Sequence, residues 1–136
     1  MVIWIIGLSG SGKTYTANNL ENILKKNYRT IIVDGDEVRK YLTYDLGYSI
    51  RDRKKNSKKI QDLSLYLESL GFLVIVPILS LFNEHQIINR KIFKKYFQIY
   101  IKADLETLKK KDVKEIYKKK KNIVGKDIKF NAPVKS

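Results

Sequence analysis

The sequence predicts an α/β protein in which a parallel β-sheet is flanked by helices. Four short apolar runs, at residues 2–6, 30–33, 72–76 and 97–101, alternate with segments of helical periodicity. This alternation is typical of successive strand and helix units. The first run is followed by a glycine-rich loop and then by a helical segment, which supports the same fold class.

The first strand and the loop after it carry the most specific motif. Residues 2–6 are continuously apolar, as expected of a parallel strand buried on both faces. Residues 7–14 read GLSGSGKT and match the pattern G-x-x-x-x-G-K-[ST] at every fixed position. In this pattern backbone N–H groups cradle a polyphosphate, Lys13 reaches the terminal phosphates, and Thr14 ligates Mg²⁺. With the helix expected over residues 15–26, the sequence predicts the P-loop NTPase fold. The candidate phosphate-binding residues are Gly7, Ser9, Gly10, Ser11, Gly12, Lys13 and Thr14.

A long helix is expected between the second and third strands. Four apolar residues recur there at helical spacing, namely Ile60, Leu63, Leu67 and Leu70. Gly71 is well placed to end this helix. We therefore expect the apolar stripe to face the core.

Two shorter helices are expected later in the chain. One follows Asn83, and we expect it to bury three isoleucines, Ile87, Ile88 and Ile92. The single histidine, His85, is expected at the surface of this helix and not to act as a catalyst. The other helix begins after Asp104, a suitable N-cap, and is expected to turn Leu105 and Leu108 inward.

Length and composition limit the class of protein. The 136 residues, 43% of them hydrophobic, fit one domain over residues 1–136. The chain has no cysteine, which excludes disulfides, thiolate metal sites and a catalytic thiol. The longest mostly apolar stretch, residues 72–82, is too short to span a bilayer, and the first residues lack the features of a signal peptide. We expect a cytoplasmic protein with no membrane partner.

The net charge of +14 is ambiguous. Taken alone, it would indicate a nucleic-acid partner. Lysines on helix faces and in the run at 118–121 are also explained as solvated surface, and a pocket for polyanionic nucleotides needs positive charge as well. Nucleic acid is therefore not the expected partner.

Two carboxylates follow the second predicted strand, in Asp34-Gly35-Asp36. Side chains that follow parallel strands emerge at one edge of the sheet, and these would lie beside the glycine-rich loop if the two strands are neighbours. One carboxylate would hold Mg²⁺, and the other would orient or deprotonate an acceptor hydroxyl. The alternative interpretation is a loop with a helix-capping aspartate.

A cluster of arginine, asparagine and tyrosine residues follows. Arg39 lies three residues after Asp36, and residues 45–56 add Tyr48, Arg53 and Asn56. Arginine binds phosphate in a bidentate manner, asparagine bonds to a sugar or base edge, and a tyrosine ring stacks on a base. Together these residues would form a site for an acceptor nucleotide, although each alone is also explained as a surface charge or a packed aromatic.

The motifs taken together resemble those of adenylylsulfate (APS) kinases, which are P-loop enzymes. The resemblance extends nearly from end to end. It rests on WIIGLSGSGKT at 4–14, VDGDEVR at 33–39, DLGYSIRDRKKN at 45–56, Ser80, KDVKEIY at 111–117, and on Gly125, Asp127, Phe130, Ala132 and Pro133. The resemblance implies transfer of phosphate from Mg·ATP to the ribose 3′-hydroxyl of a 5′-modified nucleotide.

The resemblance also implies a role for each matching residue. Gly10, Gly12, Lys13 and Thr14 would bind ATP and Mg²⁺, with Asp34 as a second metal-binding residue. Asp36 would be the catalytic base. Lys114 would belong to a basic lid at about 112–131 that closes over the reacting phosphates. The acceptor nucleotide would be bound by Arg39, Tyr48, Arg53, Asn56 and Ser80, with Tyr48 in place of a base-stacking phenylalanine.

The sequence departs from the family pattern near the acceptor site. Leu81, Phe82 and Asn83 stand where the family has Pro, Tyr or Phe, and Arg, so one arginine is absent. Ile123 replaces a second aromatic residue that clamps adenine. The loss of one stacking partner costs about 1–3 kcal/mol per base, which would redirect base choice. A cytidine diphosphoramidate kinase of capsule modification is therefore the alternative function.

Two further expectations remain open. The chain lacks the family's last strand and C-terminal helix, and an exposed sheet edge would favour a homodimer. A nucleotide- or RNA-binding module without catalysis, or a kinase that acts on nucleic-acid ends, would also use a phosphate-binding loop.

Overall fold

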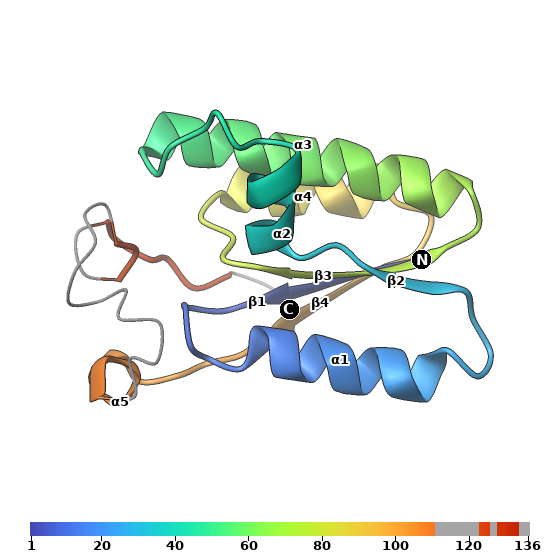
Figure 1. The fold of residues 1–136 in the computed structure, drawn as a ribbon, viewed down its shortest axis with the longest axis horizontal. Coiled ribbons are helices and arrows are strands. Elements are labelled where there is room, and N and C mark those ends of the chain that lie inside the picture. The colour runs from blue at the N-terminus through green and yellow to red at the C-terminus, as the bar shows by residue number, and fades with distance from the viewer. Residues whose placement is uncertain (111–122, 126–127, 134–136) are drawn as a thin grey trace.

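The computed structural model describes residues 1–110, 123–125 and 128–133 and confirms the α/β fold class, with helices on both faces of a parallel sheet (Figure 1). The elements in chain order are β1 (Val2–Ile6), α1 (Lys13–Leu24), β2 (Thr30–Ile32), α2 (Gly35–Tyr41), α3 (Ile50–Ser69), β3 (Leu73–Ile78), α4 (Asn83–Ile92), β4 (Tyr96–Tyr100) and α5 (Leu105–Lys110). The strands agree with the predicted apolar runs to within two residues at each end.

The four strands are parallel and lie in the order β2-β3-β1-β4. Trp4 of β1 is paired with Val76 of β3 on one side and with Gln98 of β4 on the other. β3 therefore separates β1 from β2, so the sequence-based condition that these two strands are neighbours is not met. Because all strands run the same way, the loops after β1 and β2 still leave the sheet at the same edge.

Alternate residues of the central strands point to opposite faces of the sheet. Trp4 packs with Ile60 of α3 on the face covered by α2, α3 and α4, and its ring centroid lies 6.4 Å from that of Phe93. Ile3 and Ile5 pack with Ala17 of α1 on the opposite face. β1 is buried along its whole length, which explains its uninterrupted apolar sequence.

The packing of α3 on this core leads to a stability prediction. Ile60 is fully buried, so Ile60→Ala is expected to lower the free energy of unfolding by about 2–5 kcal/mol, through lost burial and the cavity left behind. Urea denaturation followed by circular dichroism measures the change. Leu65 lies on the same helix with 38% of its surface exposed, so Leu65→Ala is the matched control and should cost less than about 1 kcal/mol. Equal losses in the two variants would contradict this packing.

The end of α3 follows the sequence prediction. Gly71 has a φ of 90°, a left-handed conformation that favours glycine, and its N–H donates to the carbonyl of Glu68 at 3.0 Å. The predicted cap of α5 is also present, because Asp104 Oδ2 accepts from the backbone N–H of Thr107 at 3.2 Å. Leu108 is buried as expected.

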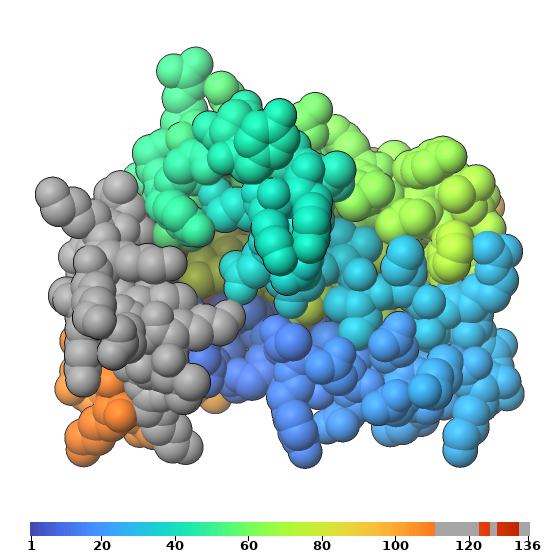
Figure 2. Space-filling model, viewed as in Figure 1, coloured from blue at the N-terminus to red at the C-terminus, as the bar shows by residue number. Residues whose placement is uncertain are grey.

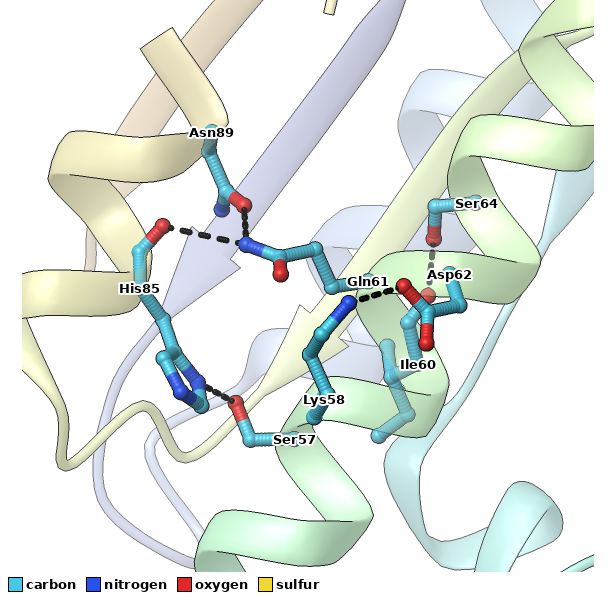
Figure 3. A network of polar contacts seen from close by, with 8 residues as sticks. All are labelled: Ser57, Lys58, Ile60, Gln61, Asp62, Ser64, His85 and Asn89. Atoms are coloured by element: carbon cyan, nitrogen blue, oxygen red, sulfur yellow. Dashed lines mark hydrogen bonds and ion pairs between the residues drawn. The ribbon is translucent and has the colours of Figure 1, made fainter. Parts of the chain in front are cut away.

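The predicted orientation of α4 is wrong for two of its three isoleucines, whereas Ile92 is partly buried and packs against the core. Ile87 and Ile88 are 57% and 41% exposed, whereas the buried residues of this helix are His85, Gln86 and Asn89. The expectation of a surface histidine is therefore also wrong. The reason is that α4 packs on a polar face of α3, where Ser57 and Gln61 form hydrogen bonds with His85 and Asn89 (Figure 3). The partner helix, and not the apolar pattern of α4 itself, determines which face is buried.

α2 is the one described helix that the periodicity of the sequence does not predict. It has seven residues, too few to display a helical repeat, and only Val38 is buried. Within the described residues, none of the helices is both long enough and apolar enough to cross a membrane.

Candidate functional site

The glycine-rich loop after β1 is folded as a tight turn into α1. Gly10 and Gly12 have φ angles of 81° and 96°, which side chains other than glycine rarely adopt. Lys13 Nζ donates to the carbonyl oxygen of Leu8 at 2.8 Å, so its side chain curls back over the loop. The loop thus combines backbone N–H groups, a cation and a helix N-terminus, the elements that bind phosphate.

Gly7, the first residue of the motif, lies where there is little room for a Cβ atom. A Cβ atom at this position would lie 2.5 Å from Ser11 Oγ and 3.1 Å from the carbonyl oxygen of Ile101. A side chain at this position would have to displace Ser11 Oγ and would also be crowded by the backbone after β4. The first glycine of the motif sets the path of the loop, while the later glycines set its turns.

Asp34 connects the glycine-rich loop to α2. Its Oδ2 accepts a hydrogen bond from Thr14 Oγ1 at 3.3 Å, and its Oδ1 accepts from the backbone N–H of Asp36 at 2.8 Å. Asp34 is the N-cap of α2 and at the same time lies beside the loop. The two interpretations left open by the sequence, a helix cap and a site carboxylate, are compatible because each uses a different oxygen.

Two cavities meet at the carboxyl edge of the sheet. One, of about 270 Å³, is lined by the glycine-rich loop and by Asp34, and the other, of about 460 Å³, extends between α2, α3 and the loop after β3. Figure 2 shows the blue residues of the loop and α1 meeting the teal residues around α2 on one face of the molecule. The residues that line both cavities are Ser9, Gly35, Asp36, Ile78 and Leu79. Asp36 is the only ionisable residue among these five, so it lies where the two cavities meet.

The larger cavity contains two arginines packed on one tyrosine. The guanidinium carbons of Arg39 and Arg53 lie 4.3 Å and 5.3 Å from the ring centroid of Tyr48. Arg39 Nη1 donates to the carbonyl of Gly47 at 2.6 Å, and Arg53 Nε donates to the carbonyl of Tyr48 at 2.9 Å. Burial, followed by repulsion from Arg39, lowers the pKa of Arg53. Two cations held close together at this cavity favour an anionic ligand.

Asn56 and Ser80 differ in their access to the larger cavity. Asn56 lines it, and its amide oxygen accepts a hydrogen bond from Thr43 Oγ1 at 2.5 Å. Ser80 lies between two lining residues, Leu79 and Leu81, but is only 1% exposed, and its hydroxyl accepts a hydrogen bond from Gln86 Nε2 at 3.1 Å. In the described structure Ser80 contributes to the packing behind the cavity wall.

Several lining residues of the larger cavity were not singled out as ligands from the sequence. Phe82 and Ile123, which the sequence marks as departures from the family pattern, both line it. Leu81, another of these departures, lines it as well, and the lining residues that the sequence did not mark are Lys40, Tyr44, Ser57, Ile78, Leu79 and Val124. Adjacency to Asn56 is the only sign that could have indicated Ser57. Lys114 and most of the expected lid at 112–131 lie outside the described residues.

The oxygen atoms beside the glycine-rich loop fit a magnesium ion. Thr14 and Asp34 supply a hydroxyl and a carboxylate, and Mg²⁺ prefers oxygen ligands that are shared with phosphates and water. Within the described part of the chain, no group of three or more His, Cys, Asp or Glu residues could hold a metal. Beyond these two protein oxygens, the remaining ligands of such an ion would be phosphate oxygens and water.

Comparisons with known proteins agree with this geometry. The chain matches the family model described as adenylylsulphate kinase over residues 1–136. It is 38% identical to a cytidine diphosphoramidate kinase of Campylobacter jejuni over 97% of this chain and 81% of that protein. It is 36% identical to an adenylyl-sulfate kinase of Bacillus licheniformis over 89% of this chain. The chain spans 63% of the length of the Bacillus protein.

The fold is similar to that of a solved APS kinase. The structure of the Mycobacterium tuberculosis APS kinase in complex with AMPPNP and APS superimposes with a TM-score of 0.90 and 30% sequence identity, over 98% of this chain and 83% of that one. The family resemblance and the P-loop kinase fold expected from the sequence are thereby confirmed.

Proposed function

The chain belongs to the adenylylsulphate kinase family, and we propose that it transfers the γ-phosphoryl group of ATP to the ribose 3′-hydroxyl of a 5′-modified nucleotide. Its homologues are kinases that act on a hydroxyl group. The observation that carries the proposal is that Asp36 lines both cavities. A carboxylate between a phosphate-binding cavity and a second cavity is in the right place to serve transfer from one to the other.

The smaller cavity is the proposed donor site. The N–H groups of residues 9–14 and the ammonium of Lys13 would bind the β- and γ-phosphates of ATP. Thr14 and Asp34 would hold Mg²⁺, which neutralises charge on the transferring phosphoryl group when it is bound. The hydrogen bond from Lys13 to Leu8 would be exchanged for bonds to phosphate oxygens.

Asp36 is the proposed catalytic base. Phosphoryl transfer needs an oriented nucleophile in line with the bond that breaks, and little covalent assistance. The carboxylate of Asp36 would accept a hydrogen bond from the 3′-hydroxyl and take its proton as the new P–O bond forms. The backbone N–H of Asp36 bonds to Asp34, so the carboxylate is attached to the first turn of a capped helix.

The larger cavity is the proposed acceptor site. Arg39 and Arg53 would bind the anionic 5′-group, and Tyr48, with 44% of its surface exposed, would contact the base. APS is the first candidate acceptor. Cytidine diphosphoramidate is the second, favoured by Ile123, which lines this cavity where the family pattern has an aromatic residue, and by the likeness to the Campylobacter kinase.

A direct test is an acceptor screen. The protein is incubated with Mg·ATP and, separately, with APS, cytidine diphosphoramidate and their unmodified 5′-nucleotides, and products are analysed by mass spectrometry. We expect a product that is one phosphate heavier with at least one 5′-modified nucleotide. Absence of turnover with all of these acceptors would refute the kinase proposal and favour a nucleotide-binding module without catalysis.

Arg53 provides a prediction specific to the acceptor. Arg53→Gln is expected to raise the KM for the acceptor about 10- to 100-fold, because a charge-assisted hydrogen bond to the 5′-group is lost, while the KM for ATP stays unchanged. Steady-state kinetics with each substrate varied in turn measure both constants. Arg51, two residues earlier on α3, is exposed and does not line the cavity, so Arg51→Gln is the matched control. A rise in the KM for ATP alone would show that Arg53 acts at the donor site and not at the acceptor site.

Two further expectations stay predictions. A cytoplasmic location is proposed because ATP is the donor. A homodimer is proposed because β4 is an edge strand of the described sheet and Phe97 on it is 54% exposed, a surface that a second copy would cover.

A further inference from the structure

A line of buried polar side chains lies behind one wall of the larger cavity, between α3 and α4 (Figure 3). Ser57 Oγ lies 2.8 Å from His85 Nδ1. Gln61 Nε2 donates to the carbonyl oxygen of His85 at 3.3 Å and to Asn89 Oδ1 at 2.6 Å. These four residues are each at most 6% exposed, yet Ser57 lines the cavity. The polar line therefore has one member at the cavity wall.

The position of the His85 ring is fixed from several sides. Gln61 bonds to its backbone, and the ring centroid lies 5.3 Å from that of Phe82, which also lines the cavity. A histidine that is held in this way controls the hydroxyl of Ser57, because a buried hydroxyl turns its proton toward an available acceptor. The direction of the Ser57 O–H bond thus depends on the protonation of His85.

The surroundings keep His85 neutral. Burial, with smaller contributions from Lys54 and Lys58, lowers the pKa of His85, and the opposing effect of Glu84 is smaller than that of burial. A neutral imidazole has one N–H donor and one acceptor nitrogen, and we assign the ring proton of His85 to Nε2. Nδ1 is then the acceptor, and Ser57 donates its proton to it. The lone pairs of Ser57 Oγ are left to accept a hydrogen bond from the cavity.

Asn56, the residue before Ser57, offers hydrogen-bond donors where Ser57 offers an acceptor. The amide oxygen of Asn56 accepts from Thr43, so the amide N–H groups are its remaining bonding capacity toward a ligand. Asn56 and Ser57 thus offer a donor and an acceptor side by side on the first half of α3. This pair matches a ligand that offers an N–H group next to an acceptor atom.

We propose that the Ser57–His85 pair makes Ser57 Oγ a hydrogen-bond acceptor that selects nucleotides with an amino group, with His85 as its positioning residue. The inference rests on the proposed acceptor site. Two sources supply such a group: the exocyclic amine of cytosine or adenine, and the amide nitrogen of a 5′-phosphoramidate. A nucleotide with oxygen at that place would direct an acceptor lone pair toward the lone pairs of Ser57 Oγ. The two acceptors would repel each other, and the site would bind this nucleotide less tightly.

The test measures dissociation constants by isothermal titration calorimetry, so that it does not depend on turnover. The base arm compares cytidine with uridine diphosphoramidate, and APS with its inosine analogue. The 5′-group arm compares cytidine diphosphoramidate with CDP. We expect the amino compound to bind about 10-fold more tightly than its oxygen counterpart in at least one arm, and the arm that shows the difference identifies the source of the amine.

Variants then assign the selectivity to the pair. Ser57→Ala and His85→Phe are each expected to reduce the difference in that arm to less than about twofold. His85→Asn should retain it, because the Asn amide oxygen occupies a place similar to that of Nδ1 and accepts the same proton. Ser64→Ala is the matched control, since Ser64 is a fully buried serine on α3 that bonds to the carbonyl of Ile60 and does not line the cavity.

The outcomes distinguish this inference from the proposed function. Equal affinities in both arms, no binding of any of these nucleotides, or selectivity that survives Ser57→Ala would each overturn it. A thermal melt of each variant identifies loss of folding. The selectivity is the ratio of two dissociation constants measured on the same variant, so a lower fraction of folded protein affects both measurements alike. Selective binding without phosphoryl transfer would support the inference while refuting the kinase proposal.

Discussion

Replacing Lys13 with alanine is expected to reduce kcat/KM for phosphoryl transfer by about 100- to 1,000-fold. Lys13 lines the smaller cavity and its ammonium bonds to a loop carbonyl, from which it would move to the γ-phosphate as charge develops there. No other lysine or arginine lines that cavity among the described residues. The loss is measured by coupled-assay kinetics at saturating acceptor.

A lysine on the far end of α1 provides the control for this variant. Lys25 follows the last turn of the helix and bonds to Asn22, away from both cavities. Lys25→Ala should change kcat/KM less than twofold. If Lys13→Ala retained more than a tenth of the activity, the glycine-rich loop would not be the donor site.

Replacing Asp36 with asparagine is expected to lower kcat about 100- to 10,000-fold while leaving the KM for ATP nearly unchanged. The substitution keeps the shape of the side chain and removes the charge that would accept the hydroxyl proton. Because the helix cap uses the backbone N–H of Asp36 and the side chain of Asp34, the fold should be unaffected. Single-turnover measurements with saturating substrates isolate the chemical step.

Asp62→Asn is the matched control for Asp36, since Asp62 is exposed on α3 and pairs with Lys58. Full activity of Asp36→Asn would show that Asp36 is not the base. A fall in thermal stability that accompanies the loss of activity would instead indicate a structural role for the carboxylate.

The residues that line the smaller cavity were largely predictable from the sequence. The motif at 7–14 predicts the conformation of the loop, because glycines at fixed positions are needed where φ is positive or where a side chain would collide. Asp34 and Asp36 were found because they directly follow an apolar strand. The strand order was not available from such local patterns, since nothing in residues 30–33 indicates that β3 lies between them and β1.

The polar interior between α3 and α4 could not be predicted. Apolar periodicity selects Ile87 and Ile88 as the buried face of α4, and both are exposed. Burial of His85 and Asn89 is favourable only because Ser57 and Gln61 of another helix satisfy their hydrogen bonds. Complementarity of this kind depends on two segments at once, and a periodic pattern within one segment does not contain it.

The origin of the two cavity walls has an evolutionary consequence. The residues that line only the smaller cavity belong to the glycine-rich loop, the start of α1, Asp34 and Pro77, whereas those that line only the larger one come from α2, the segment after it, α3 and the residues around 81 and 123. A substitution in the second set is expected to change which molecule is admitted while the proposed transfer chemistry is retained. Under the proposed function, this separation would let the acceptor change through substitutions that leave the phosphate-binding residues untouched.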